Sequence, residues 1–285
     1  MNDPLVVGVD SSESSRHALD WAADEAWERH RPLRLVHAWF GETSRAPAGQ
    51  EVRVTREAGE LLLVSARDHA LGRRPGLTVD TELVDGGARD ALTAASERAE
   101  LLTVGARGSG GFARLLLGST TLHAAAYAAC PVVVVRPDAD GPGRGGVVVG
   151  IRGDGHDDPV LEFALESAQR RNLPLLALHT WAYPLISGAG HELPPVYEEG
   201  HIAAEHDRLL AEVLADRRER FPGTVVRERS VRASTAKELV AASREHQLLV
   251  VGRHGEPHGP LGRLGSTSQA VVQHAECPVV VVPTG

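Results

Sequence analysis

Two stretches of the chain combine glycine, serine and threonine at spacings that suit the binding of an anion. The first, residues 101–108 (LLTVGARG), is followed nine residues later by Gly118-Ser119-Thr120-Thr121. Its apolar start predicts a buried strand, and Gly105 and Gly108 allow a tight turn and close backbone approach behind it. Ser119 is predicted to be the N-cap of a helix, whose unpaired N–H groups and positive dipole end favour phosphate.

The same spacing recurs in the second half of the chain. Residues 248–255 (LLVVGRHG) precede Gly265-Ser266-Thr267-Ser268, again by nine residues. The halves align at a distance of 142 residues near their starts, where Gly8 matches Gly150, and of 147 residues from the third strand onward. This repeat predicts two domains, residues 1–138 and 146–285, with a Gly- and Pro-containing linker at 139–145.

Apolar strands alternate with helices in both halves, which is typical of a parallel sheet covered on both faces. In the first half we expect strands at 5–10, 33–39, 77–84, 101–105 and 132–135. We expect helices after the serine-rich segment 11–14 and at 51–71, 88–99 and 119–129. The fold class is therefore α/β, with two tandem doubly wound domains of five parallel strands each.

The pattern Gly-x-x-Gly, nine residues, then Gly-Ser is similar to the nucleotide-binding signature of the universal stress protein family, of the ATP-binding kind. The sequence resembles a tandem member with two such domains. The resemblance implies the strand order 3-2-1-4-5 in each domain. It also implies antiparallel pairing of residues 132–135 with 279–282, which would make the chain an intramolecular pseudo-dimer; a homodimer of chains would be a further step.

The resemblance also implies roles for single residues. Asp10, at the end of the first strand, would accept hydrogen bonds from the nucleoside, and the backbone of Ala38 would contact adenine. Arg107 and Arg114 either neutralise phosphate charge or lie on a solvated surface. The predicted binding residues are Gly8, Asp10, Ala38, Val104, Gly105, Arg107, Gly108, Gly118, Ser119 and Thr120 in the first half, and Gly150, Thr180, Gly252, Arg253, Gly255, Gly265, Ser266 and Thr267 in the second.

The second half departs from the pattern at its first strand. Arg152 stands where the first half has Asp10, and Asp154 would compensate only if its loop bends back. We therefore expect the second site to bind nucleotide more weakly or to prefer another ligand.

Other kinds of site fit the sequence less well. Residues 108–113 match the dinucleotide pattern G-x-G-x-x-A but lack a helix start, and no glycine precedes a lysine as a Walker A loop requires. His37 and His179 recur on apolar strands, so we interpret them as hydrogen-bonded core residues. His201 and His206 are five residues apart, which does not suit a metal site on one helix face. No catalytic or metal-ligating residue is predicted.

Composition limits the classes of function. With 42% hydrophobic and 24% charged residues and a net charge of −8, the chain has the composition of a soluble globular protein. Neither half is basic, so no nucleic-acid surface is indicated, and no apolar run of about 18 residues suggests a membrane span. The two cysteines, Cys130 and Cys277, lie one per repeat and are interpreted as buried thiols in a reducing cytoplasm. A single lysine among 30 basic residues suggests a GC-rich bacterial genome.

We therefore expect a cytoplasmic stress-response protein that binds ATP, with Mg²⁺ or Mn²⁺ as an optional metal, and changes its interaction with an unidentified regulatory protein. The alternative is an enzyme of the same fold, a slow ATPase or a phosphoryl or adenylyl transferase, in which Asp10 orients water or Mg²⁺. A third hypothesis is a scaffold that binds no nucleotide.

Overall fold

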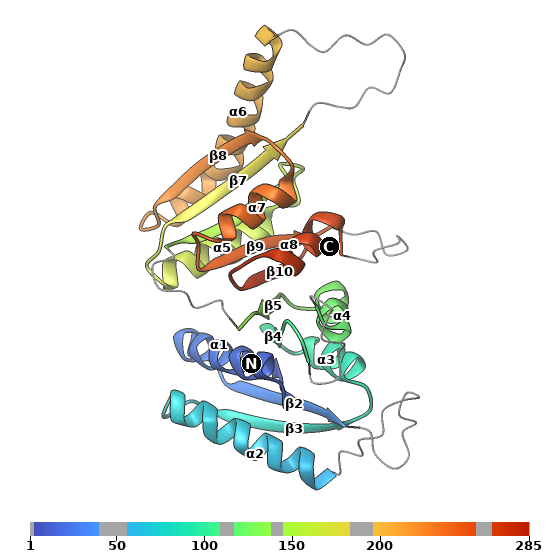
Figure 1. The fold of residues 1–285 in the computed structure, drawn as a ribbon. Helices are drawn as coiled ribbons and strands as arrows, with labels where there is room; N and C mark the ends of the chain where they lie inside the picture. Colours follow the sequence, from blue (N-terminus) through green and yellow to red (C-terminus); the bar gives the residue numbers. More distant parts are fainter. Residues whose placement is uncertain are drawn as a thin grey trace, which may run out of the picture.

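The protein, seen in a computed structural model, is an α/β structure of one large sheet between two layers of helices (Figure 1). The structure describes residues 3–39, 56–108, 117–137, 145–182, 196–254 and 264–284. The first half contains β1 (Leu5–Gly8), α1 (Glu13–Arg29), β2 (Leu33–Trp39), α2 (Arg56–Arg73), β3 (Val79–Asp85), α3 (Ala88–Ser96), β4 (Leu101–Gly105), α4 (Ser119–Tyr127) and β5 (Val132–Val135). The second half contains β6 (Val147–Ile151), α5 (Asp158–Arg170), β7 (Leu175–Trp181), α6 (Val196–Arg220), β8 (Val226–Arg232), α7 (Thr235–Ser243), β9 (Leu248–Arg253), α8 (Ser266–His274) and β10 (Val279–Pro283).

The ten strands of the described residues form a single sheet in the order β3-β2-β1-β4-β5-β10-β9-β6-β7-β8. Each half thus has the order 3-2-1-4-5, and the pairs within a half are parallel. The halves meet where β5 and β10 pair antiparallel, with Val133 opposite Val280. The expected order and the intramolecular pseudo-dimer are both confirmed.

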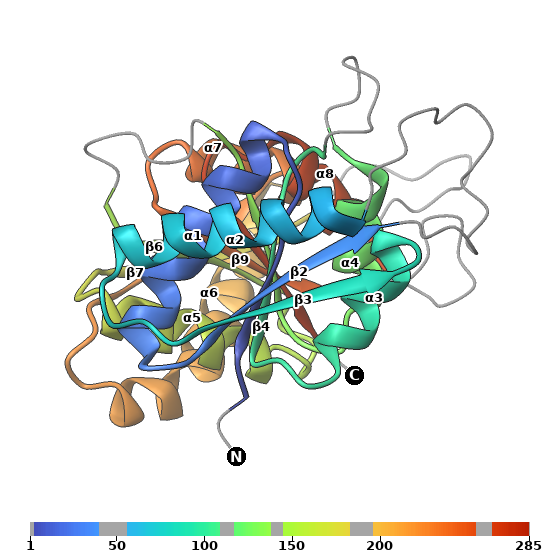
Figure 2. The same ribbon diagram turned by 90° about the horizontal axis from the view of Figure 1, so that it is seen from below.

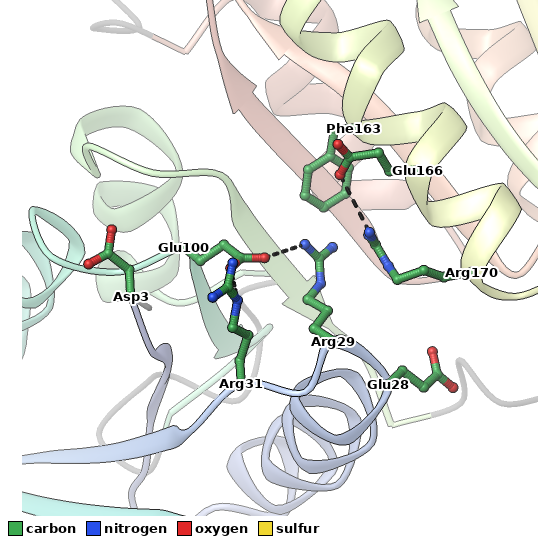
Figure 3. A pocket seen from close by; sticks show the side chains of 8 residues that line it. All are labelled: Asp3, Glu28, Arg29, Arg31, Glu100, Phe163, Glu166 and Arg170. Carbon is green, nitrogen blue, oxygen red and sulfur yellow. Dashed lines mark hydrogen bonds and ion pairs between the residues drawn. The ribbon is translucent and has the colours of Figure 1, made fainter. Parts of the chain in front are cut away.

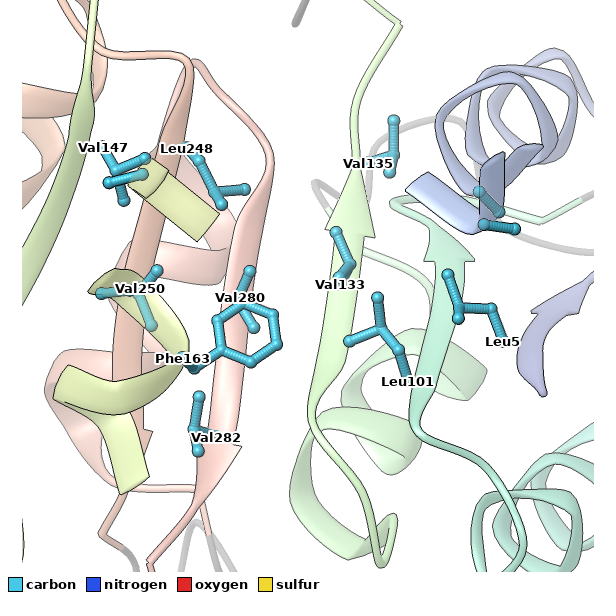
Figure 4. Close-up of a cluster of buried hydrophobic side chains, with 14 of the residues drawn as sticks. Leu5, Leu101, Val133, Val135, Val147, Phe163, Leu248, Val250, Val280 and Val282 are labelled. Atoms are coloured by element: carbon cyan, nitrogen blue, oxygen red, sulfur yellow. The ribbon is translucent and has the colours of Figure 1, made fainter. Parts of the chain in front are cut away.

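The central strands are apolar on both faces because helices cover both (Figure 2), whereas the edge strands β3 and β8 keep several exposed residues. Successive side chains of a strand point to opposite faces. Accordingly Leu5 and Val7 belong to the core shared with α1, α2, α5 and α6, whereas Val6 belongs to the core shared with α3, α4, α7 and α8. Both cores continue from one half into the other across β5 and β10. Figure 4 shows part of the core that contains Leu5 and Phe163.

Several predicted boundaries needed correction. The helix expected at 51–71 runs from Arg56 to Arg73 in the described residues; residues 51–55 lie outside them. The third strand begins at Val79 rather than Leu77, because the chain first turns through Gly76, which has a φ of 91°. The third helix ends at Ser96 rather than Ala99.

Two arginines tie the halves together beside the β5–β10 pair. Arg136 follows β5 and donates from Nη2 to the carbonyl oxygen of Val272 in α8, at 2.6 Å. Arg253, at the end of β9, donates from Nη1 to the carbonyl oxygen of Ala128, just after α4, at 2.6 Å. A cation at the C-terminal end of a helix is stabilised by the helix dipole. Each half therefore holds the C-terminal end of a helix that belongs to the other.

Candidate nucleotide site

The predicted residues of the first half meet at the edge where β1 and β4 end. The two strands are parallel neighbours, so the segments that follow them leave the sheet side by side. A carboxylate oxygen of Asp10, Oδ2, lies 2.8 Å from where a Cβ on Gly108 would be. Gly118 joins the same group, since its N–H donates to the carbonyl oxygen of Ala106 at 2.8 Å. The structure therefore brings Asp10, the glycine loop and the start of α4 together.

The loop after β1 fixes the Asp10 carboxylate. Its Oδ1 accepts a hydrogen bond from the backbone N–H of Ser12 at 2.9 Å, and the N–H of Asp10 donates to Ser15 Oγ at 2.9 Å. Ser12 is also the N-cap of α1, accepting from the N–H of Ser15 at 3.1 Å. Such a turn holds the carboxylate in place before any ligand arrives.

Two serines join this loop to the loop after β4. Ser12 Oγ donates to the carbonyl oxygen of Arg107 at 3.3 Å, and the N–H of Arg107 donates to Ser14 Oγ at 3.2 Å. Gly105 lies so close to α1 that a Cβ there would be 2.6 Å from the carbonyl oxygen of Ser14. These serines were not among the predicted site residues. The signal available was the serine-rich run 11–15 following the strand beside the glycine loop.

The start of α4 differs from the prediction in one respect. Gly118, not Ser119, is the N-cap, and Ser119 is the first residue of the helix. Gly118 has an extended backbone, and its carbonyl oxygen accepts the first helical hydrogen bond, from Leu122 at 3.0 Å. Glycine has no side chain to satisfy the N–H groups of the first turn, so they remain suited to an anion. Thr121 fixes this turn by donating to the carbonyl oxygen of Gly105 at 2.7 Å.

A cavity of about 480 Å³ opens beside Asp10, between the start of α1 and α2. Its apolar lining includes Val9, Leu19, Leu62 and Ala66, and Asp10 is the one predicted residue that lines it. Gly8 and Ala38 are half-buried near the ends of β1 and β2, and Val104 is buried in the sheet, so these three can contribute only through backbone or packing.

The remaining predicted residues of the first half are on the surface or outside the described chain. Arg107, Gly108 and Ser119 are exposed and Thr120 is half-buried. Arg107 also acts on Arg136: burial first, and then the nearby charge of Arg107, lower the pKa of the Arg136 guanidinium. Arg114 and, in the second half, Gly255 lie outside the described residues.

The second half repeats the framework of this site. Gly265 is the N-cap of α8, Ser266 and Thr267 are in its first turn, and Ser268 donates to the carbonyl oxygen of Gly252 at 2.7 Å. Thr180 shares a hydrogen bond of 2.6 Å with Thr235 of α7.

Two other predicted residues of the second half lie against other parts of the protein. Gly150 packs against Leu239. The Nη1 group of Arg253 points away from this site, to Ala128 of the first half.

The acidic residue near Arg152 does not replace Asp10. Asp154 is paired with Arg152 itself, at 3.0 Å between Oδ2 and Nε. Burial alone would raise the pKa of Asp154, but the N–H of His156 and the Arg152 charge outweigh it and lower the pKa. The loop is held instead by the buried Asp157, which accepts from the N–H groups of Arg152 and Gly153 at 3.0 and 2.6 Å.

His254 occupies space above the second glycine loop. Its ring lies directly against Gly252, where an added Cβ would collide with Nε2. Its Nδ1 is 3.2 Å from Thr284 Oγ1, near the end of the chain. Burial, followed by the charge of Arg152, lowers the pKa of His254, so the ring is neutral near pH 7. At the equivalent glycine of the first half, Gly105, the covering group is Ser14 of α1.

The core histidines are as predicted in position but differ in their partners. His37 and His179 are both buried, with Nδ1 2.7 Å from the carbonyl oxygen of Val9 and 3.0 Å from that of Ile151. His179 Nε2 is also 2.9 Å from His206 Nδ1, whereas His37 Nε2 is buried without a partner in the described chain. The equivalent of His206 is Gly59, which has no side chain to offer.

Cys130 and Cys277 are both buried and form no disulfide, and burial raises the pKa of the Cys130 thiol to about 12. Within the described ranges, no three His, Cys, Asp or Glu side chains gather as metal ligands. Over those same ranges, no helix has the length and apolarity needed to cross a membrane.

Comparison with known proteins agrees with this architecture. The model of the universal stress protein family matches residues 1–136 and 145–283. A universal stress protein of Mycolicibacterium smegmatis is 37% identical over 98% of this chain and 96% of its own length, and one of Mycobacterium tuberculosis is 34% identical over 97% and 95%. The crystal structure of a universal stress protein from Archaeoglobus fulgidus has the same fold, with a TM-score of 0.71, 19% identity and coverage of 99% and 97%. The chain belongs to the universal stress protein family, with two family domains in tandem.

Proposed function

We propose that the first half binds an adenine nucleotide, with ATP as the ligand, and that the protein is a switch whose contact with a regulatory partner depends on the bound nucleotide. The observation that carries the proposal is the joint position of Asp10, Gly108 and the N-terminal end of α4. The carboxylate suits hydroxyl groups of a ribose, and the open helix end suits phosphates. The cavity beside Asp10 gives a nucleoside room next to apolar side chains.

We propose one nucleotide per chain. In the second half the acid is replaced by Arg152, which is paired with Asp154, and His254 covers Gly252. A ligand there would have to displace the histidine ring and would find no carboxylate at the position of Asp10. The glycine loop after β9 and the start of α8 therefore support the fold, but they do not offer a ligand the contacts proposed for the first half.

A metal ion would bind together with the phosphates. Asp10 supplies a carboxylate beside the glycine loop, and carboxylate oxygens suit Mg²⁺ or Mn²⁺. We place the protein in the cytoplasm, where buried cysteines that form no disulfide are stable.

Binding is favoured over catalysis by the side chains near the site. The sole lysine of the chain, Lys237, is on α7 in the second half, so no lysine can clamp a phosphate in the first. The alternative is slow ATP hydrolysis in which Asp10 orients water. Phosphate release at a rate on the order of ten per second, within the ordinary range of enzymes, would favour that alternative.

Calorimetric titration with ATP and Mg²⁺ tests the proposal. We expect one site per chain in the wild type and loss of binding in Asp10→Asn and in Ser119→Asp. The second change places a negative charge at the start of α4, which stabilises the helix but repels phosphate, so lost binding would not reflect unfolding. Ser266→Asp, the equivalent change in α8, is the matched control and should leave binding intact. Absence of binding to the wild type at millimolar ATP, or loss of binding in the control alone, would contradict the proposal.

A further inference from the structure

The two end strands of the sheet carry opposite charges. In the described residues β3 and β8 each pair with a neighbour on one side only, and they lie at opposite ends of the molecule (Figure 1). β3 reads VDTELVD and β8 reads VRERSVR. The two halves align here by their registers with β2 and β7, which match Val79 with Val226. Each acidic residue of β3 then matches an arginine of β8: Asp80 with Arg227, Glu82 with Arg229 and Asp85 with Arg232.

Charges are distributed differently where the two halves meet. The cavity between the halves is lined by four carboxylates and three arginines (Figure 3). Arg29 pairs with Glu100 of the first half at 2.9 Å, and Arg170 pairs with Glu166 of the second half at 3.4 Å. Each half thus contributes both signs to the inner contact, whereas at the outer edges the two signs are separated by the full width of the sheet.

The matched charges of the two edges lie on the same face of the sheet. Val84 of β3 and Val231 of β8 both pack against the core shared with α3, α4, α7 and α8. Successive side chains of a strand alternate between faces, so every second residue from these valines points the same way. The charged residues on this face are Asp80, Glu82, Arg227 and Arg229.

These charges are only partly used within the chain. The side chains of Glu82 and Arg229 are each 49% exposed. Glu82 Oε2 lies 3.9 Å from Arg34 Nη1, which is too far for a hydrogen bond, while Arg229 donates to a carboxylate of α7 at 2.9 Å. Asp80 and Arg227 are exposed and make no ion pair with another described residue. Exposed pairs contribute little, so these groups remain available to a partner.

The backbone of the two edges suits an antiparallel pair. β3 and β8 run in opposite directions, because the halves are joined through the antiparallel strands β5 and β10. The N–H of Leu33 donates to Thr78, and that of Leu175 donates to Val225, both at 2.9 Å. Every second residue of β3 from Thr78, and of β8 from Val225, therefore bonds inward. The residues between them direct N–H and C=O outward: Thr81 and Leu83 in β3, and Val226 and Glu228 in β8. Figure 2 is seen from the β3 end and shows no described helix in front of this strand.

We propose that a second copy of this chain adds its β3 to β8 of the first, so that the sheet continues from one molecule into the next. The antiparallel register that joins the outward backbone groups and opposes the most unlike charges places Asp80 opposite Arg229 and Glu82 opposite Arg227. Both are pairs without a direct backbone hydrogen bond, where opposite side chains come closest.

The same register adds apolar contacts. Leu83 lies opposite Val226, and both already pack partly against the core beneath α1, α2, α5 and α6. On the other face Val84 lies opposite Val225, which is 63% exposed in the single chain. Apolar pairs opposite one another stabilise antiparallel strands. The joined edges therefore cover apolar surface as well as pairing charges.

The charges reject other pairings of the same edges. Charged residues on an edge strand normally prevent association, and two β3 edges or two β8 edges would indeed oppose like charges. A parallel β3–β8 pair would turn the second molecule over and place Asp80 and Glu82 on the face of Glu228. Only the antiparallel pairing of unlike edges fits. Each added molecule leaves one β3 and one β8 free, so assembly continues beyond a dimer.

Sedimentation velocity of the full-length chain tests this contact. At about 20 mM salt the average sedimentation coefficient should rise with protein concentration, and about 0.5 M salt should abolish the rise because it screens exposed charges. Glu82→Arg places like charges opposite each other and should abolish the rise at low salt. Arg227→Glu should do the same from the other edge. Circular dichroism checks that both variants are folded.

The chain that carries both changes gives the sharpest result. Glu82→Arg with Arg227→Glu exchanges the charges across the contact and keeps the net charge, so association should return. Glu97→Arg is the matched control: it makes the same change in net charge as Glu82→Arg, at an exposed residue after α3, and should associate like the wild type. The proposal is overturned if the wild type remains a monomer at low salt and several hundred micromolar protein. It is equally overturned if Glu82→Arg associates like the control, or if the double variant does not recover.

Discussion

At the scale of single residues, the two halves differ in what covers an equivalent glycine. Gly105 is covered by the start of α1, which also holds the Asp10 loop. Gly252 is covered by the ring of His254, three atoms of which lie within reach of an added Cβ. The side chain of His254, at the position where the first half has Arg107, thus covers a glycine that the backbone of α1 covers in the first half.

Gly105→Ala should damage the first half selectively. The new Cβ would meet backbone atoms of Ser14, which cannot move without displacing α1, so we expect a loss of about 1–3 kcal/mol in the free energy of unfolding. ATP binding should weaken with it. Gly72→Ala is the control, since nothing lies within 4 Å of its Cβ in α2, and it should be neutral or stabilising. Equal effects of the two changes, measured by urea denaturation, would be evidence against this packing.

Acidification should remove the contribution of His254 to the stability of the folded protein. Its pKa is lowered on folding, so the unfolded chain binds more protons, and the contribution of His254 to stability is complete above the unfolded value of 6.5. That contribution is lost as the pH falls from this value through the folded pKa. Denaturation at about pH 7.5 and pH 5.5 should show a larger loss of stability for the wild type than for His254→Gln. Identical losses would mean that folding does not lower the pKa of His254.

At the scale of elements, one buried acid joins α1 to α5. Glu25 is 2% exposed and contacts Arg29 of its own helix as well as Arg171, which follows α5. Burial raises its pKa, but the Arg171 and Arg29 charges outweigh burial and lower it. The reciprocal stacking of Arg29 on Phe163 and Arg171 on Trp21 shows that this contact follows the internal symmetry, while Glu25 breaks it, since its equivalent is Ser167.

Glu25→Gln should therefore be strongly destabilising, by about 3–5 kcal/mol, because it leaves buried guanidiniums without their counter-charge. Glu60→Gln, which removes an exposed partner of Arg56, should leave the free energy of unfolding nearly unchanged. Because the pKa of Glu25 is lowered, its contribution is present above its unfolded value and is lost as the pH falls below it. Chemical denaturation near neutral pH measures the free energy of unfolding of both variants. If Glu25→Gln loses no more stability than Glu60→Gln, Glu25 does not stabilise the contact between α1 and α5.

The elements also show what the sequence allows one to predict. Strand and helix order follow from local patterns, such as the apolar run Leu101–Val104 before Gly105, and the strand order from the family resemblance. Side chains that act across the fold were not predictable. The direction of Arg253 toward Ala128, the hold of Asp157 on the β6 loop and the position of His254 depend on segments that meet only after folding. The N-cap of α4 was predicted one residue too late, at Ser119, because serine is a usual N-cap residue. In the structure Gly118 has the extended backbone of the N-cap.

At the scale of the whole molecule, each half completes the sheet of the other. The β5–β10 pair consists of valines that are buried to at least 97%, and the Arg136 and Arg253 contacts lie beside it. Residues 1–138 alone would expose the edge of β5, and exposed apolar edges pair with other strands. We expect this fragment to self-associate in analytical ultracentrifugation and to form a one-to-one complex when residues 146–285 are added. If residues 1–138 form a stable monomer that does not bind residues 146–285, the shared sheet is not needed for the first half to fold.

The continuous sheet also bears on the history of such a chain. After a gene duplication, a copy that no longer binds its ligand is normally free to be deleted. Here the copy that carries Arg152 and His254 still provides β10, and deleting it would leave β5 bare. Selection can therefore relax on the loops of the second copy while remaining strict on its strands. That freedom permits the second half to acquire a different role without endangering the first.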